Sequence, residues 1–322
     1  MTFWRRRRGP RGNEPDPGFP HLNRRDAEQL RQAVRDALQH HGAAVRFDGD
    51  QAVIRHPRRG MMTVSLAGLS RDVAYSQHPK AAQHLSSAYV NDVFADPDVA
   101  ELTDAELYAG LRLRLLPAEG AGGGAAQQVT DAAALGPFTH DTLATLVVDT
   151  PHAVQTVPLK RLRELDDLAS LERAATANTR DELSRAPVDV RLNSGAEQHP
   201  GARFWSVEAD DVPVSSAALL LADALAWWLP ALDVSEGLLV AVPTRHSLLV
   251  RPITSGEDLV EGMTSIAAAA LEKSLGSRHP VSPLLHVFHE GEIETISAWE
   301  KQERHLRIIP TERLIRLMRE SP

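Results

Sequence analysis

Short apolar runs that come in pairs around tight polar turns constrain the fold of this chain more than any other feature of its sequence. Residues 238–242 and 248–253 are mostly apolar and flank the turn at 243–246, a spacing typical of an antiparallel β-hairpin. The same pattern predicts hairpins at 45–47 with 53–54, at 142–149 with 153–157, and at 284–288 with 293–296. Segments of helical periodicity separate the hairpins. The sequence therefore predicts an α+β fold, in which helices pack on mainly antiparallel sheets, and not a doubly wound sheet.

The first helix shows how the helical segments are recognised. Leu30, Val34 and Leu38 recur at the spacing of one helix face. Asp26 is a suitable N-cap residue, and Gly42 stands where a glycine commonly ends a helix. Helical periodicity of the same kind predicts further helices, which are expected at 80–94, 162–178, 215–229 and 259–275.

The length of the chain, 322 residues, favours two modules over one. We predict an N-terminal α+β module at 21–118 and a C-terminal α+β module at 138–322. A flexible loop rich in glycine and alanine is predicted between them at 119–137. Residues 1–20 contain five arginines and four prolines. Because such a composition does not form a packed core, we expect a disordered basic tail.

Composition excludes several classes of function. The chain has no cysteine, which excludes disulfides, thiolate nucleophiles and cysteine-ligated metal centres. Its net charge of -8 opposes nonspecific binding of nucleic acid by the folded body. The longest apolar run, at 217–229, is shorter than the roughly 20 residues of a transmembrane helix. No secretory signal is recognised either, so we expect a cytoplasmic protein that needs no cofactor.

Two features point to a protein partner of unknown identity. Trp227 and Trp228 end the apolar helix predicted at 215–229. Because adjacent residues of a helix do not face the same core, we expect one indole in the core and the other half exposed, where it is a candidate to bind a partner. Arg245, on a predicted hairpin tip, is a candidate to bind an anionic group, although a polar tip is also expected for solubility alone. The leading hypothesis is a non-enzymatic adaptor or chaperone-like protein.

Two alternative functions stay open. Asp210, Ser215 and His246 are the residue types of a hydrolase site, with Asp211 and Ser216 as possible substitutes. The chain has no Gly-x-Ser-x-Gly motif, and Ser215 equally suits a helix N-terminus. The other alternative is a regulator whose arginine-rich tail binds nucleic acid or an anionic lipid surface, against the simpler role of a solubilising arm.

Metal and nucleotide sites are not predicted. His279, His286 and His289 form the densest histidine group, and three imidazoles can ligate zinc. However, residues three apart on a strand face opposite sides of the sheet, so His286 and His289 do not share a site. The glycines at 120–124 lack the Lys-Ser/Thr pair of a phosphate-binding loop.

The order of several short motifs is similar to that of a known family. The motifs are Ala-Ala-Thr-Ala-Asn at 174–178, Ala-Asp-Asp at 209–211, Ser-Ser at 215–216 and Gly-Leu-Leu-Val-Ala-Val-Pro at 237–243. In them the chain resembles the YtpQ-like family of bacterial proteins of unknown function, over roughly residues 25–300. The chain has Asn178-Thr179 where the family has Asn-Leu, and Asp211-Val212-Pro213 where it has Asp-Gly-Tyr. The resemblance implies a shared fold and ancestry, and no substrate, cofactor or catalytic residue.

Overall fold

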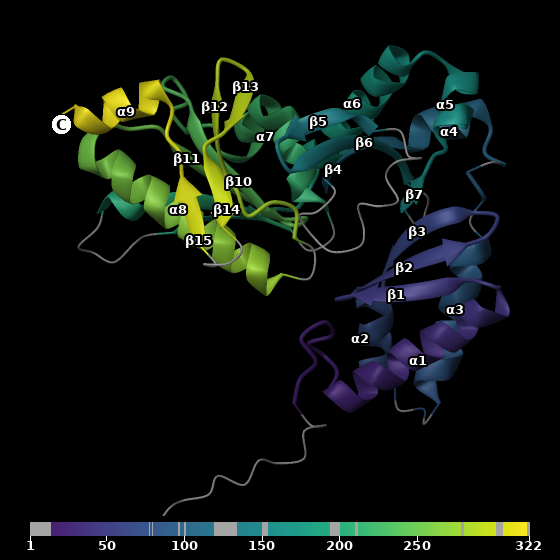
Figure 1. Cartoon of the computed structure of the whole chain (residues 1–322). Helices are drawn as coiled ribbons and strands as arrows, with labels where there is room; N and C mark the ends of the chain where they lie inside the picture. The colour runs from purple at the N-terminus through teal and green to yellow at the C-terminus, as the bar shows by residue number, and fades with distance from the viewer. Residues whose placement is uncertain are drawn as a thin grey trace, which may run out of the picture. The chain divides into compact units, whose positions relative to one another are not determined.

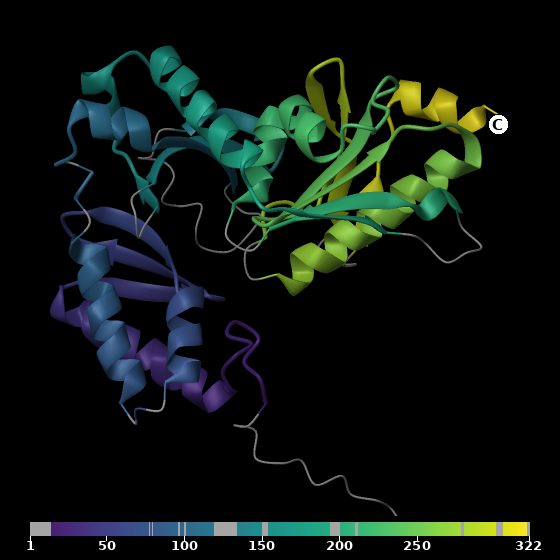
Figure 2. The ribbon, with the colours of Figure 1, turned by 180° about the vertical axis from the view of Figure 1, so that it is seen from behind.

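The computed structural model of the chain divides into two compact units, which are described separately (Figure 1, Figure 2). Unit 1 comprises Met1–Gly110 and Val148–Val157, and unit 2 comprises Leu111–Val147 and Pro158–Pro322. The division therefore falls at Gly110, before the loop in which the sequence places it. The structure describes residues 14–76, 78, 80–95, 97–99, 101–118, 134–149, 154–193, 200–209, 212–277, 280–300 and 305–320.

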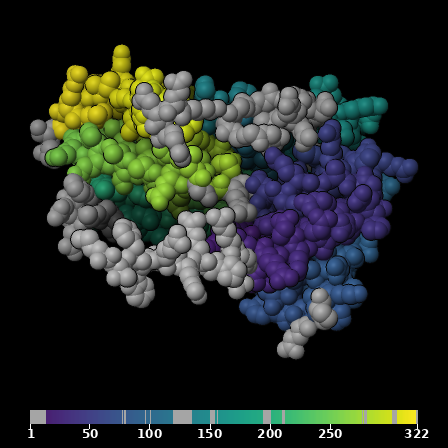
Figure 3. Space-filling model, turned by 60° about the horizontal axis from the view of Figure 1, so that its bottom comes forward, coloured from purple at the N-terminus to yellow at the C-terminus, as the bar shows by residue number. Residues whose placement is uncertain are grey.

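Unit 1 consists of antiparallel strands in the order β1-β2-β3-β7, with helices packed against them. Helices α1 and α3 lie side by side (Figure 1), and Figure 3 shows their surfaces in purple and blue. The elements are α1 (Arg24–His40), β1 (Ala44–Asp48), β2 (Gln51–His56), β3 (Gly60–Ser65), α2 (Ala67–Tyr75), α3 (Ala81–Ala95), α4 (Asp104–Gly110) and β7 (Val154–Thr156). The hairpin predicted at 45–54 is confirmed as β1 and β2.

Helix α1 forms because one stripe of its surface is apolar and its first turn is capped. Leu30, Val34 and Leu38 are buried in the core of unit 1. The N-cap residue is Asn23 and not the predicted Asp26, since the Asn23 side chain accepts a 2.9 Å hydrogen bond from the Asp26 backbone N–H. Gly42 follows the helix with a φ of 70°, a conformation that glycine adopts without strain.

Residues 14–20 are folded, which corrects the prediction that the first 20 residues are a disordered tail. Phe19 is fully buried in the core of unit 1. Asp16 is buried and accepts hydrogen bonds from the Phe19 backbone N–H and from Arg31 Nη2, at 3.1 and 2.7 Å. The prediction failed because it was based on the average composition of the segment, whereas two single residues, Phe19 and Asp16, make specific contacts with Arg31 of α1. Residues 1–13, with all five arginines, lie outside the described residues.

Unit 2 is built around a sheet in the order β13-β12-β10-β11-β9-β8, in which all neighbours are antiparallel. The fold class predicted from the sequence, α+β with antiparallel sheets, is confirmed. The elements of unit 2 are β4 (Leu111–Pro117), β5 (Ala134–Thr139), β6 (Thr142–Asp149, whose last two residues belong to unit 1), α5 (Leu159–Leu165), α6 (Leu168–Ser184), β8 (Asp189–Asn193), η2 (Pro200–Ala202), β9 (Phe204–Glu208), η3 (Val214–Leu220), α7 (Leu221–Trp228), β10 (Leu238–Thr244), β11 (Ser247–Pro252), α8 (Gly256–Gly276), β12 (Leu285–His289), β13 (Glu292–Thr295), β14 (Ser297–Glu300), β15 (His305–Ile308) and α9 (Glu312–Arg319).

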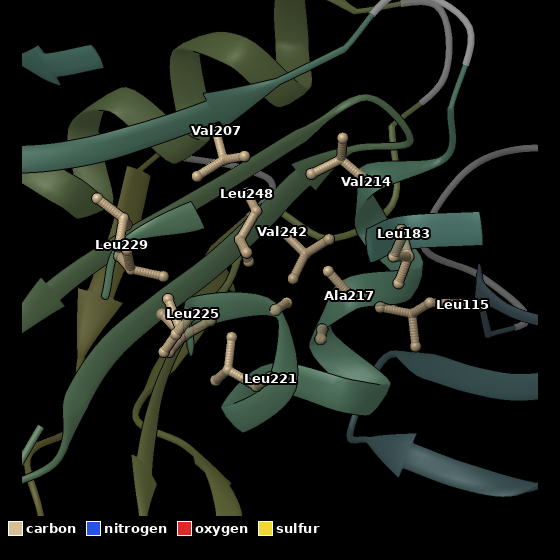
Figure 4. Packing of buried hydrophobic residues seen from close by; sticks show 14 of the residues in the cluster. Leu115, Leu183, Val207, Val214, Ala217, Leu221, Leu225, Leu229, Val242 and Leu248 are labelled. Atoms are coloured by element: carbon tan, nitrogen blue, oxygen red, sulfur yellow. The ribbon is translucent and has the colours of Figure 1, made fainter. Parts of the chain in front are cut away.

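Both faces of the central hairpin β10–β11 are covered, which explains why its strands are almost continuously apolar. Val242 and Leu248 face a cluster that includes Leu221 and Leu225 of α7 (Figure 4). The alternate residues, Leu239 and Leu249 among them, pack in a second cluster with α8 and α9. Because side chains alternate along a strand, a strand covered on both faces is apolar at most positions; the buried Ser247 and Arg251 are the polar exceptions in β11.

Helix α6 covers strand β4 with polar contacts. The Leu113 backbone N–H donates to Thr179 Oγ1 at 2.8 Å, and Asn178 Nδ2 donates to the Leu111 carbonyl at 3.0 Å. The buried Arg114 binds both carboxylate oxygens of Glu182, at 2.8 and 2.9 Å. β4 ends its row of strands, and such edges carry backbone groups that need partners. Side chains of α6 supply them.

Two predicted boundaries differ from those of the structure, one of a loop and one of a helix. The loop predicted at 119–137 ends earlier, because β5 begins at Ala134 and pairs with β6; residues 119–133 lie outside the described part. The helix predicted at 215–229 begins as a 3-10 helix, and only its second half is α-helical. Among the described residues, no helix is long and apolar enough to cross a membrane.

Candidate functional site

A cleft of about 470 Å³ opens on unit 1 beside the end of α3 and the turn between β2 and β3. Charged and polar side chains dominate its lining, which brings together the C-cap residue of α1, residues of β2 and of the following turn, and residues of α3 and of the segment after it. The lining residues are His41, His56, Arg58, Arg59, Asn91, Phe94, Ala95, Asp98 and Glu101.

Phe94 holds the lining together. The His41 ring stacks on it, with centroids 4.3 Å apart and an angle of 10° between the planes. His56 meets Phe94 edge-on at 5.4 Å. The Arg59 guanidinium carbon lies 5.4 Å from the Phe94 centroid, and its Nη2 donates to the Phe94 carbonyl at 2.9 Å. Because these three neighbours already pack on Phe94, the ring organises the cleft and is not an open platform for stacking.

Hydrogen bonds fix where the two imidazoles carry their protons. His56 Nδ1 accepts the backbone N–H groups of Arg58 and Arg59, at 3.2 and 3.1 Å. An accepting Nδ1 has no proton, so the N–H of His56 is on Nε2. His41 Nε2 lies 3.1 Å from Asn91 Oδ1, an oxygen that only accepts, so His41 donates through Nε2. The Asn91 amide nitrogen is left as a donor to the cleft.

Arg58 is the uncommitted cation of the cleft. Its side chain is exposed and forms no hydrogen bond or ion pair with any residue that the structure describes. The neighbouring Arg59 is instead bound to Phe94. Two carboxylates, Asp98 and Glu101, also line the cleft. The site thus offers one guanidinium without a partner among the described residues, and two further N–H donors beside two carboxylates. This arrangement suits an anionic group with a cation next to it.

The tryptophans that the sequence singles out do not form an exposed surface. Trp227 and Trp228 are both partly buried and pack against the α7 side of the core of unit 2. Both indoles therefore have intermediate exposure, where the sequence predicts one in the core and one half exposed, and their role in binding a partner stays a prediction. Helix α7 ends at Trp228, and the backbone N–H of its C-cap residue Leu229 bonds to the Leu225 carbonyl.

Arg245 lies on the turn between β10 and β11, as predicted, but it is only partly exposed. Its carbonyl accepts a 3.0 Å hydrogen bond from the Ser215 backbone N–H. The turn is therefore held against the beginning of η3 and is not a projecting tip.

The hydrolase hypothesis is tested only in part. Ser215 and His246 lie near each other in the fold. The Ser215 backbone N–H donates a hydrogen bond to the carbonyl of Arg245, the residue before His246, and His246 Nδ1 donates to the Val212 carbonyl at 3.2 Å. However, Ser215 is 1% exposed, and a nucleophile must reach its substrate. Asp210, like Asp211, lies outside the described residues. The hydrolase site stays a hypothesis.

Two of the three histidines that form the densest group lie within the described residues. His286 is 1% exposed in β12, and its Nδ1 lies 3.1 Å from Thr295 Oγ1. Burial lowers the pKa of His286 to about 4, so the ring is neutral at physiological pH. His289 is partly exposed at the end of the same strand, and His279 lies outside the described residues. Within the described part of the chain, no group of three His, Asp or Glu residues is placed to hold a metal ion.

Comparison of the chain with protein-family models, with curated proteins and with solved structures found no match. The resemblance to the YtpQ-like family therefore stays a prediction. The fold and the site define the chain as an α+β protein with a polar cleft.

Proposed function

We propose that the protein is a non-enzymatic adaptor, and that the cleft around Phe94 is where an anionic group of its protein partner binds. Arg58 carries this proposal. An exposed guanidinium without a partner among the described residues is a place where an anionic ligand is favoured. The neighbouring His56 supplies an N–H donor of fixed position.

The lining favours binding over covalent chemistry. None of the described lining residues has a hydroxyl, thiol or amine side chain, so the described lining does not offer covalent catalysis of the serine, cysteine or lysine type. The lining is also too polar for a typical apolar small-molecule pocket. A polar lining that offers several hydrogen-bond donors supports recognition of an anionic group of a partner.

A charge reversal at Arg58 tests the proposed function. The full-length protein, as wild type and as Arg58→Glu, is used to capture partners from a lysate of its native cells, with quantification by mass spectrometry. Arg71→Glu is the matched control, because Arg71 is an equally exposed arginine of unit 1 on α2, outside the cleft lining. We expect at least one protein to be captured by wild type and Arg71→Glu and to be reduced about tenfold or more with Arg58→Glu. Equal capture by all three proteins would contradict the proposal.

A further inference from the structure

We infer that the group bound in the cleft of unit 1 is a phosphoryl group on a polypeptide, next to a basic residue. This inference rests on the proposed adaptor function and names its ligand class.

The donors of the cleft match a phosphoryl group in number and origin. Arg58 offers its guanidinium, His56 offers Nε2–H, and Asn91 offers its amide nitrogen, since its Oδ1 is engaged by His41. These three donors come from the β2–β3 turn, from β2 and from α3. A phosphate monoester presents three terminal oxygens that only accept hydrogen bonds, whereas a planar carboxylate is satisfied by the fork of one arginine. Three donors on three elements therefore favour the phosphoryl group.

The same lining disfavours nucleic acid. Proteins that bind single strands offer aromatic faces on which bases stack, and Phe94 is already packed against His41, His56 and Arg59. Asp98 and Glu101 would also repel a run of phosphates. A single, compact anionic group fits these constraints better than a polyanion.

The two carboxylates add a second requirement. Glu101 lines the cleft with an exposed side chain that has no partner among the described residues. A carboxylate beside a phosphoryl site is repulsive unless the ligand brings a positive charge of its own. A phosphorylated residue followed by lysine or arginine provides it, and inorganic phosphate does not.

The test measures fluorescence anisotropy of three labelled peptides with the full-length protein. Their common sequence is alanine-lysine-X-lysine-alanine, where X is phosphoserine, serine or glutamate. We expect the phosphoserine peptide to bind about tenfold or more tightly than the other two. Arg58→Glu should remove this binding, and Arg71→Glu should leave it unchanged. Equal binding of the phosphoserine and glutamate peptides, or no binding of either, would overturn the phosphoryl assignment.

A second variant separates a polypeptide ligand from a free phosphate. Glu101→Gln should weaken the affinity for the phosphoserine peptide on the order of threefold, because the peptide lysine loses its carboxylate partner. The same variant should bind inorganic phosphate more tightly by a similar factor, which a competition experiment measures. Shifts in the same direction, or phosphate that binds more tightly than the peptide, would overturn the polypeptide source. If the peptides fail while Arg58→Glu still loses a captured protein, the adaptor function stands and only its ligand class is wrong.

Discussion

Arg251 lies directly against Gly262: a Cβ atom at Gly262 would overlap the Arg251 guanidinium. Arg251 is 5% exposed, and its Nη2 donates to Asp258 Oδ2 at 2.6 Å and to the Asp258 carbonyl at 3.0 Å. The glycine in the middle of α8 thus makes room for a buried charge that holds the first turn of the helix to β11. The apolar cluster of α8 forms around this polar contact.

Substitution of this glycine should destabilise the protein. We expect Gly262→Ala to lower the free energy of unfolding by about 1–3 kcal/mol, because the added methyl group displaces Arg251 from its bonds. Urea denaturation measures the change. Gly68→Ala on α2 is the matched control, since a Cβ there meets nothing within 4 Å, and it should be neutral or stabilising by up to about 1 kcal/mol. Two equal effects would mean that Arg251 does not need the space.

The pair Asp16–Arg31 should stabilise unit 1 in a pH-dependent way. Burial alone would raise the pKa of Asp16, but hydrogen bonds from Arg31 and Gly18 outweigh it and lower the pKa below its ordinary value. A lowered carboxyl pKa stabilises the fold above the unfolded pKa of about 3.9, and this stabilisation is lost as the pH falls through the lower folded value. Asp16→Asn should cost about 3 kcal/mol at neutral pH, because it leaves Arg31 without its buried partner.

The difference between wild type and Asp16→Asn should shrink once the pH falls below about 4. Denaturation at several pH values measures it. The control is Glu28→Gln, which removes the exposed neighbour of Arg31 at 3.6 Å and should change stability by less than about 1 kcal/mol. A difference that does not depend on pH would show that Asp16 acts by packing alone.

The buried His286 should make the protein sensitive to mild acid. Its pKa of about 4 lies below the unfolded value of about 6.5, so the unfolded state binds a proton first as the pH falls. This linkage should cost about 2 kcal/mol of stability between about pH 6.5 and about pH 5. His286→Gln removes the titrating group, so its stability should fall less over that range. Parallel curves for the two proteins would exclude His286 as the source.

The hydroxyl group of Thr179, which accepts the hydrogen bond from the Leu113 backbone N–H of β4, should stabilise the fold. Thr179→Val leaves the buried Leu113 N–H without an acceptor and should cost about 2 kcal/mol. Thr176→Val is the matched control, because Thr176 lies one turn earlier on α6 and its side chain is only partly buried. That change should stay within about 0.5 kcal/mol. If both variants unfold at the same denaturant concentration, the bond to Leu113 contributes nothing.

Local signals predicted most elements of the fold. The hairpin β10–β11 and helix α8 were predictable because their apolar patterns extend over many residues. Strand β8 was missed although its sequence, Asp-Val-Arg-Leu-Asn, alternates polar and apolar residues, because this short edge strand contains only two apolar residues. The pairing of Asp16 with Arg31 was missed because it joins residues fifteen apart through one carboxylate.

The cleft was not predictable from local pattern. The turn Arg58-Arg59-Gly60 was visible only as a basic turn, and nothing near it in the sequence indicates His41 or Asn91. These two residues, which bind each other, are 50 positions apart. Sites made by long-range packing need the fold before they can be recognised.

The most direct test of the central claim, that an anionic group binds at the cleft, is a nitrogen–proton NMR spectrum of the labelled full-length protein, recorded before and after the phosphoserine peptide is added. The side-chain signals that decide are the Asn91 amide, His56 Nε2–H and the indole N–H groups of Trp227 and Trp228. The account predicts that the Asn91 and His56 signals shift and that the two indole signals do not. Shifted indoles with unchanged Asn91 and His56 signals would contradict it and place binding at α7.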